Sequence, residues 1–203
     1  MTRSPDDITI RPATMADCRR IAELFQISSE GVVDYIWEQL KPEYPGLSPL
    51  EIGERRYRRE STPFSYQNCL MAEHGGEAIG MLHAFVMEAR DGPPGPIDPV
   101  LRPYAEMEAP GSFYIAGLAV LPGYQGRGIG TRLLAAARER ARTLGATELS
   151  LIVFAGNRGA LRLYAREGFE EIDRRKVVPH PLIAHTGDAL LMTAPLSRPQ
   201  PAR

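Results

Sequence analysis

The sequence predicts an α/β fold in which helices lie on both faces of a mixed, mostly antiparallel sheet. Two observations support this prediction. Short apolar segments in the first half are joined by tight turns, and an apolar segment in the second half leads into an amphipathic helix and another strand. The 203 residues are 43% hydrophobic and 24% charged, which is enough for one domain with its own core. We therefore predict a single domain at residues 8–196, with a disordered N-terminus at 1–7 and a C-terminal tail at 197–203.

The first half predicts three helices and three strands. Ser48, Pro49 and Glu51 form a capping box with proline at the first helical position, which marks a helix start. The pair Gly75-Gly76 is typical of a hairpin turn between two strands. The expected elements are a strand at Ile8–Arg11, a helix capped by Thr14, helices at Gly31–Leu40 and from Ser48 to about Glu60, and strands at Asn68–His74 and Glu77–Met87.

The second half opens with a proline-rich segment, Ala89–Gly111, which we expect to be a loop with one helical turn at Val100–Met107. A strand at Phe113–Leu121 follows, and then a helix that ends at Gly145. The apolar face of that helix is predicted to contain Ile129, Leu133, Leu134, Ala137, Ala141 and Leu144. The remaining expected elements are a strand at Glu148–Phe154, a helix at Asn157–Glu167, and strands at Glu170–Val178 and Asp188–Leu196.

Composition and charge exclude several classes of protein. A formal net charge of −1 gives no general attraction to nucleic acid or to an anionic membrane, so we expect neither as a partner. The start of the chain has no apolar leader, and no segment is long enough to span a bilayer. Two cysteines are too few for a disulfide framework, which favours a cytoplasmic location.

A glycine-rich turn between a predicted strand and the following helix is the most informative feature of the sequence. Glycine allows positive φ and close approach of a ligand at Gly126, Gly128 and Gly130. The backbone N–H groups at a helix N-terminus bind anions, and Arg127 adds a cation. The turn therefore predicts a cradle for a pyrophosphate.

Two other phosphate-binding motifs fit this turn less well. A P-loop requires a lysine that reaches the phosphates, and the turn contains none. A dinucleotide-binding fingerprint has different glycine spacing and an acidic residue at the end of the second strand, whereas Glu148 begins its strand.

The turn and a second motif resemble those of the GNAT superfamily of acyl-CoA N-acyltransferases. The first is Gln125-x-x-Gly128-x-Gly130 after an apolar strand. The second is Asn157-x-x-Ala160-x-x-x-Tyr164-x-x-x-Gly168-Phe169. The two motifs occur in the family's order, with one strand between them. The resemblance implies a GNAT-like fold, in which two neighbouring parallel strands splay apart.

The resemblance also implies how acetyl-CoA binds. The coenzyme would lie between the splayed strands and pair with the backbone of Leu118, Ala119 and Val120, one of whose N–H groups would stabilise the oxyanion. Asn157 and Ala160 belong to the second motif, and Asn157 would hydrogen-bond the pantetheine arm. The pyrophosphate would be held by Gln125, Gly126, Arg127, Gly128, Ile129, Gly130 and Thr131. No metal is implied.

The implied mechanism is direct attack of an amine on the thioester. Tyr164 occupies the position whose phenol protonates the departing thiolate. Family members often place a glutamate where this chain has Tyr114 or Ala116, on the same strand face as Leu118 and Val120. Tyr114 could order a water that relays the proton. The sequence leaves the base open between this water and the side chains of Glu73, His83, Glu106, Glu108, His180 and His185.

We therefore expect an N-acetyltransferase that acts on a primary amine of a small molecule or amino-acid-like acceptor. Alternatives are a longer acyl-CoA, a protein N-terminus or lysine as acceptor, and a non-catalytic acyl-CoA sensor. Relatives are often dimers, so a homodimer is compatible with the resemblance. Four aromatic side chains could either line an amine pocket or pack in the core, namely Tyr35, Trp37, Phe64 and Tyr66.

Overall fold

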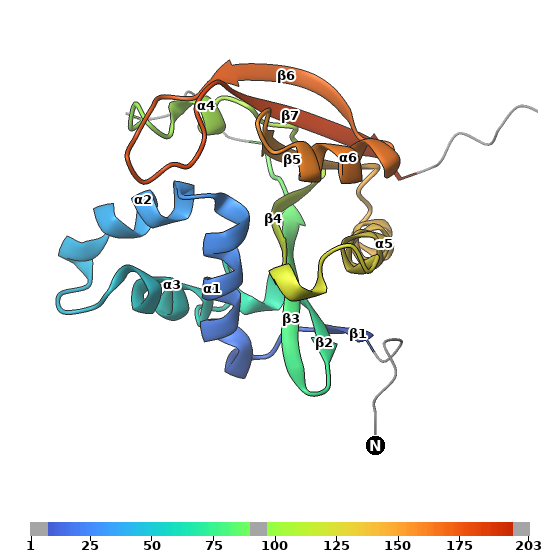
Figure 1. The fold of residues 1–203 in the computed structure, drawn as a ribbon, viewed down its shortest axis with the longest axis horizontal. Coiled ribbons are helices and arrows are strands. Elements are labelled where there is room, and N and C mark those ends of the chain that lie inside the picture. Colours follow the sequence, from blue (N-terminus) through green and yellow to red (C-terminus); the bar gives the residue numbers. More distant parts are fainter. Residues whose placement is uncertain (1–7, 90–96, 197–203) are drawn as a thin grey trace, which may run out of the picture. The chain divides into compact units, whose positions relative to one another are not determined.

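The computed structural model describes residues 8–89 and 97–196, so the predicted disordered N-terminus and C-terminal tail lie outside the described residues, as do three prolines of the proline-rich loop. Seven strands form one sheet in the order β1-β2-β3-β4-β5-β7-β6 (Figure 1). Pairing is parallel between β4 and β5 and antiparallel between β1 and β2, β2 and β3, β5 and β7, and β6 and β7. The strands are β1 (Ile8–Pro12), β2 (Cys69–His74), β3 (Glu77–Val86), β4 (Phe113–Val120), β5 (Glu148–Phe154), β6 (Glu170–Lys176) and β7 (Asp188–Pro195).

The helices form close to where the sequence predicts them. Ser48 caps α3 through the expected capping box with Glu51, and Asn157 caps α6. The α-helices are α1 (Cys18–Ser29), α2 (Val32–Gln39), α3 (Pro49–Tyr57), α4 (Arg102–Ala105), α5 (Ile129–Thr143) and α6 (Arg158–Arg166). Short 3-10 helices are η1 (Met15–Asp17), η2 (Lys41–Glu43), η3 (Tyr66–Asn68) and η4 (Pro122–Tyr124).

The chain divides into two compact units. Unit 1 contains the described residues up to Ala84, together with Ala116–Ala137 and Pro181–Ala184. Unit 2 contains Phe85–Ile115, Arg138–His180 and the described residues from His185 onward. The predicted mixed α/β architecture is confirmed.

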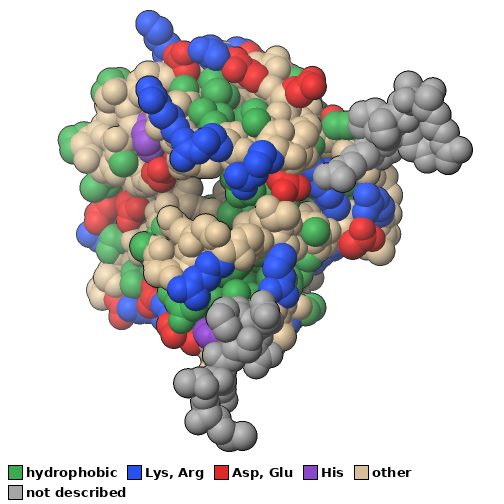
Figure 2. Space-filling model, turned by 45° about the vertical axis from the view of Figure 1, so that its right-hand side comes forward, with side chains coloured by type: hydrophobic (Ala, Val, Ile, Leu, Met, Phe, Trp, Pro, Cys, Tyr) green, Lys and Arg blue, Asp and Glu red, His purple; other side chains and the backbone are tan. Residues whose placement is uncertain are grey.

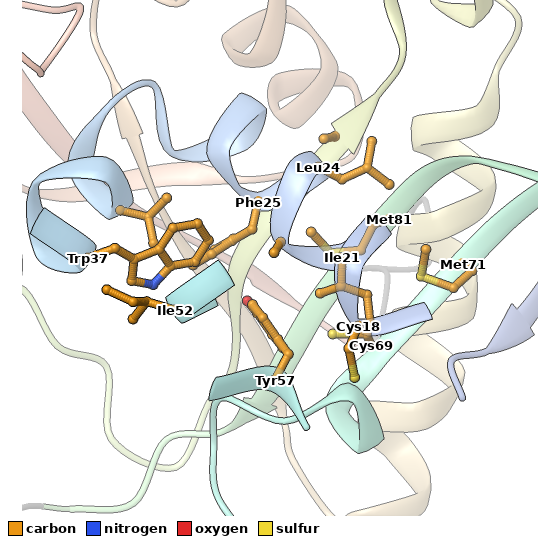
Figure 3. Packing of buried hydrophobic residues seen from close by; sticks show 13 residues of the cluster. Cys18, Ile21, Leu24, Phe25, Trp37, Ile52, Tyr57, Cys69, Met71 and Met81 are labelled. Carbon is orange, nitrogen blue, oxygen red and sulfur yellow. The ribbon is translucent and has the colours of Figure 1, made fainter. Parts of the chain in front are cut away.

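The core of unit 1 is built from α1, α2, α3 and the strands β2, β3 and β4 (Figure 3). Phe25 of α1 lies at its centre, with its ring 6.5 Å from Trp37 and 5.8 Å from Tyr57. Trp37 is only 2% exposed and packs over Gly53, where a Cβ would lie 2.3 Å from the indole. Trp37 is therefore a core residue, and the amine-pocket interpretation is wrong for it.

The core of unit 2 packs around β5 and β7, which pair along their full lengths. Buried residues alternate with half-buried ones along β4, as predicted for a strand with two different faces. Leu144, expected on the apolar face of α5, is instead 54% exposed, because it lies beyond the last helical residue, Thr143. Its neighbour Gly145 has φ 77°, the left-handed conformation typical of a helix C-terminus.

Charged side chains of both signs are interspersed over the face of the molecule shown in Figure 2. Among the described residues, no group of three His, Cys, Asp or Glu side chains is arranged to hold a metal ion. None of the helices in the described ranges is long and apolar enough to cross a membrane.

Candidate active site

The predicted site residues fall into two groups. Leu118–Thr131 belongs to unit 1, whereas Tyr114, Asn157, Ala160 and Tyr164 belong to unit 2. Within unit 1, β4 ends at Val120, η4 reverses the chain, and α5 begins at Ile129.

The loop leaves the space above its two central glycines open. Gly126 and Gly128 have φ of 76° and 75°, a conformation that favours glycine. A Cβ built on either residue would meet no other atom within 4 Å. The positive φ is therefore needed for the backbone path, and the open space allows a ligand to approach the main chain. Gly130 differs, because it lies within the first turn of α5.

Through its backbone, the loop can bind an anion only with N–H groups that are not already hydrogen-bonded. The N–H of Gln125 donates to the carbonyl of Pro122 at 3.3 Å. The sequence predicts this amide as a pyrophosphate donor, but in the structure it is already used. Within the described part of the chain, the N–H groups of residues 126–131 donate to no carbonyl or side chain, and the helical ladder starts with Arg132 donating to Gly128. Six amides at a helix N-terminus are thus available, which fits a diphosphate.

Two side chains hold this loop in shape. Gln125 donates from Nε2 to the carbonyl oxygen of Val120 at 3.0 Å and so ties the loop back to the end of β4. The guanidinium of Arg127 lies 5.3 Å from the ring centroid of Tyr124. Both contacts are made by residues next to or within the segment of open amides, 126–131.

In unit 2, β4 and β5 pair over three residue pairs, from Phe113–Leu149 to Ile115–Leu151. Beyond Leu151, β5 continues to Phe154 in register with β7. Tyr114 lies in the paired part, with its ring 5.7 Å from that of Phe85. Desolvation raises the pKa of Tyr114 to about 12. Its phenol is therefore neutral at physiological pH and can orient a water but cannot itself accept the amine's proton.

The second motif forms the start and the buried face of α6. Asn157 Oδ1 accepts a hydrogen bond from the N–H of Ala160 at 3.0 Å, so Asn157 caps α6 and the Ala160 amide is already used. Tyr164 is 7% exposed, and its ring lies 5.5 Å from that of Phe169. The family position of Tyr164 is thus occupied by a phenol that packing holds in one place.

Several candidates for the general base have structural partners. His83 is fully buried: its Nε2 donates to the Pro63 carbonyl at 2.9 Å, and its Nδ1 therefore accepts from the Tyr57 hydroxyl at 3.1 Å. Glu73 pairs with Arg11 at 2.7 Å. Neither is available to a substrate. Glu106 lies 3.9 Å from Arg175.

His185 differs from these candidates in its position. Its ring stacks on Phe154, the last residue of β5, with centroids 4.7 Å apart. A Cβ on Gly156 would lie 2.8 Å from His185 Nδ1, so the imidazole lies against the turn that leads to Asn157.

Tyr104 was not singled out from the sequence. Its ring is nearly perpendicular to that of Phe154, with centroids 6.1 Å apart, and its buried hydroxyl has no hydrogen-bond partner among the described residues. The sequence of the proline-rich segment does not indicate a site residue at Tyr104, because it does not show that α4 lies near the end of β5.

Comparison with known proteins gives a consistent result. The family model described as "Acetyltransferase (GNAT) family" matches residues 33–169, which include both motifs. An uncharacterized N-acetyltransferase, YycN of Bacillus subtilis, is 39% identical over 71 residues, which are 34% of this chain and 46% of YycN. The chain thus matches less than half the length of this curated relative.

Solved structures match over nearly the whole chain. A protein described as an acetyltransferase has 22% identity and a TM-score of 0.65, covering 93% of this chain and 100% of its own. The PaiA N-acetyltransferase of Thermoplasma acidophilum, in complex with coenzyme A, has 18% identity and a TM-score of 0.58, covering 93% and 99%. These similarities confirm the fold.

Proposed function

Because the chain belongs to the acetyltransferase (GNAT) family, we propose that it transfers an acetyl group from acetyl-CoA to a primary amine of a small molecule or amino-acid-like acceptor. The observation that supports coenzyme binding most directly is the set of free amides at residues 126–131. They provide six donors and the positive end of the α5 dipole for a diphosphate.

The residues of this chain would contribute three steps. Free amides of the loop hold the diphosphate and thereby fix where the thioester lies. A backbone N–H of Leu118–Val120 donates to the thioester oxygen as negative charge develops on it. The Tyr164 phenol gives its proton to the sulfur as the carbon–sulfur bond breaks, so the coenzyme leaves as a thiol.

We further propose that His185 accepts the proton that the attacking amine must lose, directly or through a water. Its position beside Phe154 and the turn before Asn157 supports this role. Tyr104, whose ring contacts the same Phe154 ring, offers its buried hydroxyl to a polar atom of the acceptor. A hydroxyl without a partner costs about 1–3 kcal/mol, which a bound acceptor would relieve.

Release of free thiol from acetyl-CoA tests the proposal. The purified protein is assayed with a panel that contains small primary amines, free amino acids, amino-acid amides and short peptides with free N-termini. We expect thiol release above the uncatalysed rate with a small amine or amino-acid-like compound, and a large loss of turnover in His185→Gln. Thiol release with the peptides alone would show that the acceptor is a protein N-terminus and not a small amine. Tight binding of acetyl-CoA without release for any amine would identify a sensor.

A further inference from the structure

The positive charge of Arg127 is not paired with a carboxylate in the part of the chain that the structure describes. Within residues 8–89 and 97–196, no acidic side chain pairs with it, whereas Arg11, Arg20 and Arg174 each contact two or more carboxylates. Its guanidinium instead lies 5.3 Å from the centre of the Tyr124 ring. A cation held over an aromatic face keeps its full charge and loses rotational freedom. The side chain is therefore restrained while its charge remains available.

Tyr124 is anchored by the sheet of unit 1. Its N–H donates to the carbonyl of Leu121 at 2.9 Å, and the N–H of Leu121 donates to Ile79 of β3 at 2.9 Å. The Tyr124 ring also lies 5.8 Å from the ring of His74, the last residue of β2. His74 is itself fixed in register with Ile8 of β1. The ring under Arg127 is therefore attached to β2 and β3 rather than to the loop alone.

Charge and position together indicate the ligand. Arg127 lies in sequence between the two positive-φ glycines, so the ring-held cation belongs to the same loop as the six free amides. Arginine binds phosphate through two parallel N–H donors, and this geometry benefits from a restrained guanidinium. We propose that Tyr124 is a positioning residue, which holds Arg127 for a phosphate oxygen of the coenzyme. This inference rests on the proposed function.

Binding measurements on three ligands test the proposal. Calorimetry is carried out with coenzyme A, with coenzyme A lacking its 3′-phosphate, and with pantetheine, which has no phosphate. We expect Arg127→Ala to weaken coenzyme A binding about tenfold, as for loss of a charged hydrogen bond. Tyr124→Leu should weaken it by about three- to fivefold, because only the cation–π restraint is lost. Tyr124→Phe, which keeps the ring, should bind as the wild type does.

The variants should also reveal whether the two residues act together. In an Arg127→Ala background, Tyr124→Leu should cause no further loss, because the ring then has no guanidinium to hold. Turnover at saturating acetyl-CoA should be unchanged, whereas KM for acetyl-CoA rises. Pantetheine should bind all variants equally. If Tyr124→Leu fails to fold, Arg127→Lys replaces it, since an ammonium keeps the charge but loses the planar fork.

The outcomes distinguish which phosphate of coenzyme A is bound by Arg127. They also distinguish failure of this proposal from failure of the proposed function. An equal loss for coenzyme A with and without its 3′-phosphate identifies the diphosphate, and a loss confined to intact coenzyme A identifies the 3′-phosphate. Both support the proposal. Equal weakening of pantetheine, or wild-type affinity in Tyr124→Leu beside a weakened Arg127→Ala, overturns it and leaves the proposed function standing. A wild-type protein that binds no coenzyme A overturns both.

Discussion

The hydroxyl of Tyr57 donates a hydrogen bond to Nδ1 of His83 at 3.1 Å inside the core of unit 1. Both side chains are almost fully buried, and the Phe25 and Phe64 rings lie against the imidazole. Burial raises the pKa of Tyr57 well above its usual value, so the phenol remains a donor. His83 is thus a core histidine whose two nitrogens both have partners.

Tyr57→Phe should lower the free energy of unfolding by about 1–3 kcal/mol, because the buried Nδ1 of His83 loses its donor. Urea denaturation measures the change. Tyr44→Phe is the matched control, since the Tyr44 hydroxyl has no hydrogen bond to any described residue, and it should change stability by less than about 0.5 kcal/mol. Similar losses in both variants would show that the hydrogen bond contributes nothing specific.

Arg11 should determine part of the acid sensitivity of unit 1. It pairs with Asp17 at 2.8 Å, and the pKa of Asp17 is lowered from 3.8 to about 2, mainly by this side-chain hydrogen bond. A carboxyl whose folded pKa is depressed stabilises the protein above its unfolded pKa and loses that contribution as the pH falls toward the folded pKa. Stability should therefore fall between about pH 4 and 2.

In Arg11→Gln, this acid-dependent fall should be smaller, because Asp17 loses the hydrogen bond that lowers its pKa most and keeps those from Thr14. Thermal unfolding across the pH range measures the slope. Arg19→Gln is the control, since its carboxylate contacts are longer, at 3.4 and 3.6 Å. An unchanged slope in Arg11→Gln would contradict the assignment.

Gly128→Glu should abolish coenzyme binding and leave the protein folded. The free protein has open space at the Gly128 Cβ, but the new carboxylate would repel a diphosphate held by the amides around it. Gly128→Ala controls for the strain of positive φ, which both variants share at about 1 kcal/mol. Calorimetry with coenzyme A should show a far larger loss for the glutamate variant. Equal affinities of the two variants for coenzyme A would contradict the assignment of the diphosphate to this loop.

Tyr164→Phe should reduce turnover more than it reduces coenzyme affinity. The phenylalanine ring keeps the contact with Phe169, so only the proton donor is lost. Steady-state kinetics with saturating acetyl-CoA should give a kcat lowered by about 10²-fold or more, the usual contribution of an acid catalyst. An unchanged kcat would exclude Tyr164 from the chemistry.

Local signals made much of this structure predictable. The capping box at Ser48 and the amphipathic stretch before Gly145 fix helix boundaries by short-range hydrogen bonds and periodicity, so the sequence alone locates them. The glycine turn is predictable for the same reason. The partner of His83 and the orphan hydroxyl of Tyr104 depend on contacts between distant segments. Such contacts leave no periodic trace in the sequence.

Gly117 shows how a long-range contact constrains a residue that sequence reasoning treats as ordinary. A Cβ there would lie 2.6 Å from Ser28 Oγ and 2.8 Å from the Phe25 ring. Gly117→Ala should therefore destabilise the protein by about 1–3 kcal/mol, as overpacking does. Gly159→Ala in α6 is the control, because its Cβ meets only an ordinary contact at 3.6 Å and alanine favours helix. Denaturant titration should give opposite signs for the two variants.

The membership of Pro181–Ala184 in unit 1 has a consequence for biosynthesis. The N–H of Ala184 donates to the carbonyl of Glu30 at 2.9 Å, so a segment translated after both sequence motifs completes the structure around the α1–α2 turn. During synthesis the α1–α2 turn lacks this contact until Ala184 has left the ribosome. Stop codons upstream of residue 181 would therefore leave both units incomplete.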